Sequence, residues 1–205
     1  MTNTSPNTSP NASPLAASPL AASPLAASPL AASKQGLIAK PGSRGIDPRA
    51  PRFGAGITAV LLLVVIGLAL SADISRLATF AERASRPAFI LFVVITGLFA
   101  WGAFAGVSRH PYGWLYRTVV RPRLGAPTHL EDPKPPTFSQ AVGLVVTAAG
   151  VVLHLVGVPF GLVTCAAAAF IAAFLNTAFD YCFGCQIYLL LVRAGRVGRK
   201  ADARA

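Results

Sequence analysis

The chain has 205 residues, of which 54% are hydrophobic and only 12% are charged, and its mean hydropathy is +0.58. A soluble domain carries about 25% charged residues, so this composition excludes an ordinary soluble domain. The formal net charge of +11 could indicate nucleic-acid binding. The basic residues, however, lie between apolar runs, and no basic domain studded with aromatic residues remains. We therefore exclude nucleic acid as a partner.

The first 45 residues differ in composition from the rest of the chain. Ser-Pro-Leu-Ala-Ala begins at Ser13 and occurs four times, ending at Ala32. A proline in every repeat prevents an α-helix, and the segment has too little bulk to form a core. We expect residues 1–45 to be a disordered tail that serves as a spacer or a docking segment. The tail lacks the basic start and apolar stretch of a signal peptide, so the first membrane helix is expected to direct insertion.

Charge-free runs predict four membrane helices within residues 46–192. The runs at 53–72 and 87–108 each have the roughly 20 residues that cross a bilayer core. The run at 135–179 is long enough for two crossings at about 1.5 Å per residue, with a turn at Pro159. The expected fold class is therefore all-α, an integral membrane four-helix bundle that has the lipid bilayer as its partner. The helices are expected at about 54–71, 87–107, 139–158 and 160–192, with a break allowed near 180–185.

The distribution of basic residues predicts the orientation of these helices. Fifteen of the 18 Lys and Arg residues lie on the side of the two termini, including the basic tail at 193–205, and three lie on the other side. Cytoplasmic loops carry the excess of Lys and Arg, so both termini are expected in the cytoplasm. The loop at 108–140 mixes Trp, Tyr and Arg, which predicts a short helix on the inner membrane surface.

A Cys-x-x-Cys pair, Cys182 and Cys185, is the feature best suited to chemistry. On a helix the two residues lie about 60° apart on one face, close enough for a disulfide. Redox-active pairs use this spacing at a helix N-terminus, which favours the first thiolate, and a break at Gly184 could create such an end. In a continuous helix the cysteines would instead be small packing residues. Both interpretations remain open, and redox or sulfur chemistry is preferred.

Asp180 is the unusual charged residue of the last helix. It lies four residues from Asn176 and therefore on the same helical face, whereas Cys182 points to a different side of a regular helix. A carboxylate at the bilayer centre costs about 2.5–3.5 kcal/mol. We therefore expect Asp180 either to accept protons near the thiols or to lie at the interface beside a loop arginine such as Arg121 or Arg123.

We expect no metal centre and no cofactor. A structural zinc site needs four ligands, and the chain has one Cys-x-x-Cys pair without a second. Cys165 lies 17 residues before Cys182, roughly 25 Å along a helix, at a depth similar to that of His154. We interpret Cys165 and His154 as packed residues.

Four segments in order carry a resemblance to a known family: 47–54, 121–124, 131–136 with Phe138 and Gln140, and Asn176 with Cys182, Cys185 and Tyr188. Over about residues 46–192 the chain resembles the bacterial membrane family called domain of unknown function 4395. The resemblance implies a four-helix membrane protein associated with thioredoxin-like or sulfurtransferase proteins. Asp180 stands where that pattern usually has Gly, and Gln186 where it often has an acid.

Two functions are consistent with these features. The first is a thiol protein that exchanges disulfides or carries sulfur, in which Cys182 attacks and Cys185 resolves, with Asp180 as a weaker candidate for the same site. Its partner would be a cytoplasmic thioredoxin-like or sulfurtransferase protein. The second is a non-enzymatic scaffold or small transporter subunit in which the cysteines are structural. The two functions differ in whether the protein is an enzyme.

Overall fold

The computed structural model describes residues 36–40, 42–71 and 79–196. In this part of the chain every extended regular element is a helix, and β-pairing is limited to isolated bridges. The all-α four-helix bundle predicted from the sequence is confirmed. Of the predicted disordered tail, residues 36–40 and 42–45 are described, and the rest lies outside the described residues.

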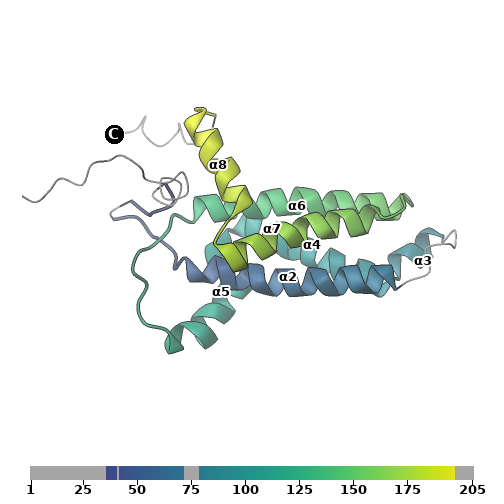
Figure 1. Ribbon diagram of the computed structural model, residues 1–205, viewed down its shortest axis with the longest axis horizontal. Helices are drawn as coiled ribbons and strands as arrows, with labels where there is room; N and C mark the ends of the chain where they lie inside the picture. Colours follow the sequence, from purple (N-terminus) through teal and green to yellow (C-terminus); the bar gives the residue numbers. More distant parts are fainter. Residues whose placement is uncertain (1–35, 41, 72–78, 197–205) are drawn as a thin grey trace, which may run out of the picture.

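Four long helices form the bundle: α2 (Arg49–Leu70), α4 (Pro87–Ala105), α6 (Lys134–Leu155) and α7 (Gly161–Phe179). α2 packs against α4 and α7, and α6 packs against the same two helices, so that neighbours run in opposite directions (Figure 1). Each helix has 19 or 22 residues and is apolar enough to cross a membrane. At roughly 1.5 Å per residue, such a helix matches a bilayer core about 30 Å thick.

The outer surface of the bundle is apolar. Val60, Leu63, Ile90, Val145 and Ile171 are among its exposed large side chains. A continuous apolar surface of this kind would drive aggregation in water, but it is the normal surface of a helix that contacts lipid tails. The exposed side chains therefore support the assignment of all four helices as membrane-spanning.

The packed core is concentrated in the half of the bundle near α3 (Phe80–Ala84) and reaches the middle of the bundle at Ile95 and Ala169. Leu62 comes from the second half of α2, Phe92 from the first half of α4 and Ala166 from the first half of α7, and all three are fully buried. The short helix α3 lies at this end (Figure 1), and the Thr79 side chain caps its first turn. The candidate functional site lies towards the opposite end of the bundle and meets the core at Ile95 and Ala169.

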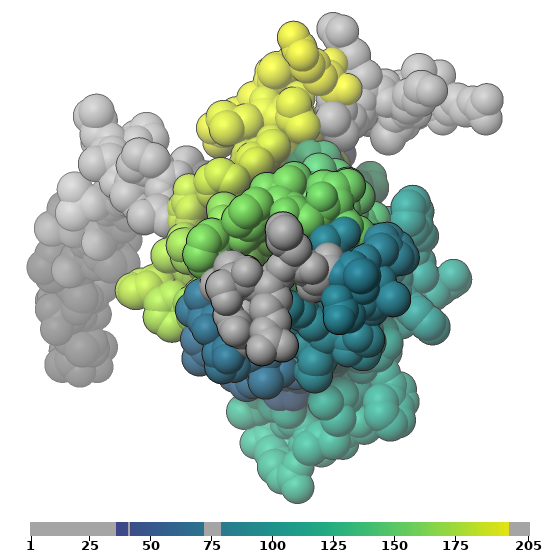
Figure 2. All heavy atoms as spheres, turned by 90° about the vertical axis from the view of Figure 1, so that its right-hand side faces the viewer, coloured from purple at the N-terminus to yellow at the C-terminus, as the bar shows by residue number. Residues whose placement is uncertain are grey.

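Two segments project sideways from the end opposite α3 (Figures 1 and 2). One follows α4 and comprises η1 (Val107–Arg109), α5 (Pro111–Leu115), η2 (Tyr116–Val120) and η3 (Arg121–Arg123); the other is α8 (Phe183–Arg193). Seen along the bundle, α8 and the α5–η3 segment extend beyond the outline of the long helices on opposite sides (Figure 2). Both segments therefore run across the bundle axis rather than along it. This direction, together with the exposed ring of Trp114, is typical of helices that lie in a membrane interface.

The chain before α2 is paired with the chain before α6 at this same end. The backbones of Ile46 and Glu131 exchange two hydrogen bonds of 2.9 Å, and the N–H of Ala39 donates to the carbonyl of Leu130 at 2.9 Å. The pairing brings two segments far apart in sequence next to the end of α7 and the start of α8, where they contribute to the site.

Candidate functional site

A break at residues 180–182 divides the last apolar stretch into α7 and α8. Asp180 ends α7 with a left-handed backbone (φ 56°, ψ 31°), and the next N–H, of Tyr181, bonds back to the carbonyl of Leu175 at 3.2 Å. The left-handed conformation is unfavourable for most L-residues but accessible to Asp and Asn. The break therefore occurs at Asp180, before the position of Gly184 that the sequence suggested.

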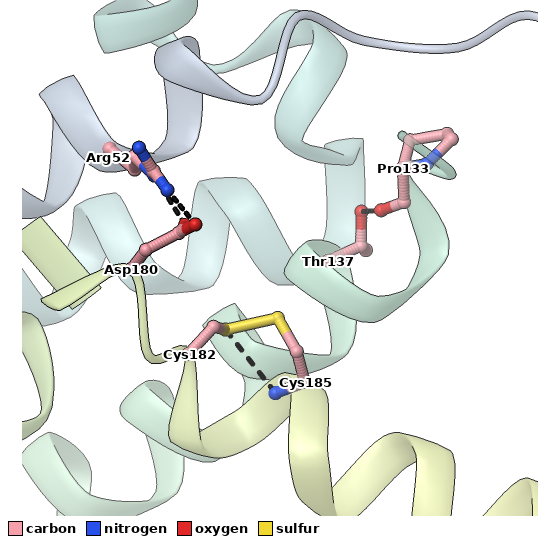
Figure 3. Close-up of a disulfide and its surroundings, with 6 residues drawn as sticks. All are labelled: Arg52, Pro133, Thr137, Asp180, Cys182 and Cys185. Carbon is pink, nitrogen blue, oxygen red and sulfur yellow. Dashed lines mark hydrogen bonds and ion pairs between the residues drawn. A yellow bond between two sulfur atoms is a disulfide. The ribbon is translucent and has the colours of Figure 1, made fainter. Parts of the chain in front are cut away.

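The carboxylate of Asp180 forms an ion pair with Arg52, in the first turn of α2 (Figure 3). Thr177 adds a second link between these helices, because its hydroxyl donates to the carbonyl of Arg52 at 2.9 Å. The sequence pointed to a loop arginine such as Arg121, whereas the structure pairs Asp180 with a helical arginine. A positive charge in the first turn of a helix interacts unfavourably with the helix dipole, and this sequence signal marks Arg49 and Arg52 alike.

Cys182 and Cys185 lie at the start of α8 and form a disulfide (Figure 3). Their Cα atoms are 5.2 Å apart, within the usual range of about 4.4–6.8 Å. The Cys182 sulfur is the N-cap of α8 and accepts a hydrogen bond from the backbone N–H of Cys185 at 3.3 Å. Cys182 is partly exposed, whereas Cys185 is 3% exposed. The two sulfurs are therefore unequal in access.

Gly184 lets the first turn of α8 lie directly on α6. A Cβ atom at this position would be 2.5 Å from the Ser139 hydroxyl oxygen and 2.7 Å from the Ser139 Cα. No larger residue fits without moving one of the two helices. The role of Gly184 is therefore to hold the disulfide against α6 by close packing, rather than to break the helix.

A cavity of about 770 Å³, here called the central cavity, extends from Cys182 and Cys185 into the bundle. Its deep end is lined by Ile95, Val146 and Ala169, which lie near the midpoints of α4, α6 and α7. The α7 side of its wall consists of alanines: Ala168, Ala169, Ala172 and Ala173. The volume falls within the range of about 300–1,000 Å³ that is typical of small-molecule sites.

Polar side chains line the central cavity near the sulfurs. They come from three helices: Ser139 and Gln140 from α6, Asn176 from α7 and Gln186 from α8. Asp180 and Arg52 also line this end. Each of the four segments that carry the family resemblance therefore contributes to one wall or rim of the same cavity.

Asp47 lies at the charged rim of the central cavity, where it binds residues from two elements. Its carboxylate accepts hydrogen bonds from the Arg49 backbone and side chain, at 3.0 Å each, and from the Tyr116 hydroxyl, at 3.0 Å. Burial by itself raises the pKa of Asp47, but these hydrogen bonds outweigh it and hold the pKa below its ordinary value. Asp47 is therefore ionised at neutral pH and ties the start of α2 to η2.

His110 is buried beside the same cavity and is held in its neutral form. Its Nε2–H donates to the carbonyl of Leu98 at 3.1 Å, and its Nδ1 accepts from the backbone N–H of Tyr112 at 3.2 Å, which caps α5. Burial lowers the pKa of His110. Protonation of Nδ1 would also remove the cap, because that nitrogen could no longer accept.

The remaining residues singled out in the sequence lie elsewhere. Cys165 packs beside Gly150 in the half of the bundle near α3. His154 stacks on Phe89 with ring centroids 5.0 Å apart, and its Nε2 lies 3.2 Å from the carbonyl oxygen of Arg83. Across the part of the chain that the structure describes, no group of three His, Cys, Asp or Glu residues could hold a metal ion.

Comparison with known proteins identifies the family of this chain. The model of the family described as Domain of unknown function (DUF4395) matches residues 46–193. This match covers more than half of the chain, which therefore belongs to that family. No curated protein and no solved structure matches the chain.

Proposed function

We propose that this member of the DUF4395 family exchanges thiols and disulfides through Cys182 and Cys185. The observation that carries the proposal is the position of Cys182 as the N-cap of α8, with its sulfur accepting the backbone N–H of Cys185. In the reduced protein the same N–H and the helix dipole favour the thiolate of Cys182. The thiolate is the form that attacks a disulfide.

The difference in exposure between Cys182 and Cys185 indicates which of them reacts first in the two exchange steps. The partly exposed Cys182 thiolate attacks a substrate disulfide, forms a mixed disulfide and releases one substrate thiolate. The buried Cys185 then attacks the Cys182 sulfur, which releases the second substrate thiolate and forms the internal disulfide. The substrate gains two electrons and the cysteine pair loses two. The reverse sequence oxidises a substrate dithiol.

Asp180 acts in this proposal as a positioning residue. Its carboxylate is already paired with Arg52 and its backbone makes the turn into α8. Both features fix where Cys182 lies. We therefore do not assign Asp180 as the proton acceptor for the thiols.

The proposed partner is a cytoplasmic thioredoxin-like or sulfurtransferase protein. The charge distribution supports a cytoplasmic side. The cysteines lie at the bundle end where residues 42–52 and the basic α5–η3 segment also lie, and Lys and Arg concentrate in cytoplasmic loops. A partner with an exposed reactive cysteine could approach Cys182 at the start of α8.

Redox-state trapping in membranes tests the proposal. Full-length protein with Cys165→Ser is equilibrated in membranes with glutathione buffers of graded potential and then blocked with a mass-tagged maleimide. We expect the two thiols to change together from fully labelled to unlabelled, as a single two-electron transition. Cys182→Ser, in the same background, should leave one thiol that is not oxidised internally. Thiols that stay unlabelled even under strong reductant would contradict exchange and favour a non-enzymatic scaffold or transporter subunit.

A further inference from the structure

We propose that the central cavity binds an amphiphile with one anionic head and an apolar body. The head lies among the arginines of the α5–η3 segment, and the body lies between α4, α6 and α7. This proposal does not depend on thiol exchange, because it concerns occupancy of the cavity rather than the chemistry of the sulfurs on its wall.

The deep part of the central cavity suits an apolar occupant. The free-energy cost of an empty apolar cavity grows with its volume, so the apolar part of a cavity of about 770 Å³ would destabilise the bundle if it stayed dry. Water is a poor occupant of the deep end, because Ile95, Val146 and Ala169 offer no side chain that could form a hydrogen bond with it. Apolar cavities exclude water and bind apolar molecules.

The side chains of α7 are arranged to keep this space open. Its bulky residues Ile171 and Phe174 point outward, where they are exposed, whereas Ala172 and Ala173 face the cavity. Because the wall is built from methyl groups, it can accept a chain or ring of carbon atoms along the helix. Bulky residues placed inward would have filled the space.

The rim of the cavity carries a surplus of positive charge. Asp47 and Asp180, two of the three acids that line it, are already paired with Arg49 and Arg52. The remaining charged lining residues are three arginines and one acid: Arg44, Arg117, Arg121 and Glu131. Guanidinium groups bind carboxylates and phosphates through charge-assisted hydrogen bonds. An anionic head at the rim with an apolar body beneath it matches this distribution.

Two sources share this ligand chemistry. A free long-chain fatty acid carries a carboxylate, and a membrane lipid carries a phosphate. Both are amphiphiles that partition into membranes, and the rim arginines can bind either head.

Direct binding to the full-length protein tests the proposal. Radiolabelled palmitate is added to immobilised protein in an uncharged detergent, and bound palmitate is measured by scintillation proximity. Ala172→Phe places a ring in the cavity and should lower bound palmitate at least tenfold. Ala178→Phe is the matched control, because Ala178 lies on the outward face of α7 and is exposed. It should bind as the wild type does.

The binding of the anionic head by the rim arginines is tested separately. Arg121→Gln should weaken palmitate binding several-fold, whereas Arg123→Gln, an exposed arginine outside the cavity wall, should not. Unlabelled palmitate and hexadecyl phosphate should displace the label at much lower concentration than hexadecanol. Extraction of the purified protein followed by mass spectrometry identifies the source, and retention of either a fatty acid or a phospholipid above the level in Ala172→Phe supports the proposal.

Two results would overturn it. One is equal palmitate binding by Ala172→Phe and Ala178→Phe, with both variants folded by thermal melting. The other is displacement by hexadecanol as effective as by palmitate, together with full binding by Arg121→Gln. If Ala172→Phe does not fold, the Arg121→Gln and Arg123→Gln comparison decides the outcome.

Discussion

Residue by residue, the site is fixed by a few side chains with specific backbone roles. Asp180 combines a left-handed backbone with an ion pair to Arg52, and Cys182 combines an N-cap with one half of a disulfide. The Cys-x-x-Cys spacing predicted that the sulfurs would meet. It did not predict which sulfur is accessible, because that depends on the contact between α8 and α6.

The two roles of Asp180 can be separated by substitution. Asp180→Asn keeps a residue that tolerates the left-handed conformation and should cost at most about 1 kcal/mol, because the ion pair is partly exposed. Asp180→Ala also loses that tolerance and should cost about 1–2 kcal/mol more. Chemical unfolding in detergent micelles measures both values. Equal destabilisation by the two variants would contradict a backbone role for Asp180.

His110 predicts a pH dependence with a defined sign. Folding lowers the pKa of His110 from about 6.5, so the unfolded chain binds more protons in the window below 6.5. Its contribution to stability is therefore complete above pH 6.5 and is lost as pH falls below it. The melting temperature of the wild type should decrease between pH 7 and pH 5. His110→Asn retains a capping side chain and should show a smaller decrease; an identical slope would exclude His110 as the cause.

At the scale of elements, most of the helical arrangement follows from the sequence. Charge-free runs predicted the four long helices because a bilayer core imposes their length. The start of α8 was less predictable, since the local sequence allowed a break at several positions. The direction of α8 depends on the Gly184 contact with Ser139, and a contact between distant segments has no signature in the local pattern.

Two glycine substitutions test this contact. Gly184→Ala should destabilise the protein by about 1–3 kcal/mol, the usual cost of overpacking, because the new methyl group meets Ser139. Gly97→Ala is the matched control: a Cβ there meets nothing within 4 Å, so the change should stabilise α4 by about 0.5–1 kcal/mol. Unfolding in detergent measures both effects. A neutral Gly184→Ala would show that α8 does not rest on α6 in solution.

For the whole molecule, the packed core near α3 and the central cavity at the other end divide the bundle into two halves. The sequence predicted the bundle but not the cavity, because a cavity depends on which faces of α4, α6 and α7 meet. The alanines of α7 are equally compatible with close helix packing. The convergence of four separate segments on one cavity likewise requires the fold.

The orientation of the bundle can be measured in whole cells. Single cysteines are introduced at Ser85, beside α3, and at Thr128, in the loop before α6, in a background with all three native cysteines replaced by serine. Both positions are exposed. The excess of basic residues at the α8 end predicts that an impermeant maleimide labels Ser85→Cys but not Thr128→Cys. The reverse pattern would place the Cys182–Cys185 end outside the cytoplasm.

The measurement that tests the central claim most directly is the pH profile of Cys182 alkylation in the Cys165→Ser, Cys185→Ser protein. The backbone N–H of residue 185 is retained in this variant, so the N-cap interaction with the Cys182 sulfur can still form. A thiolate favoured by the start of α8 should reach half of its limiting alkylation rate below pH 8.5, the value of an ordinary thiol. A profile centred at or above about pH 8.5 would contradict an activated Cys182 and leave the cysteines as structural residues.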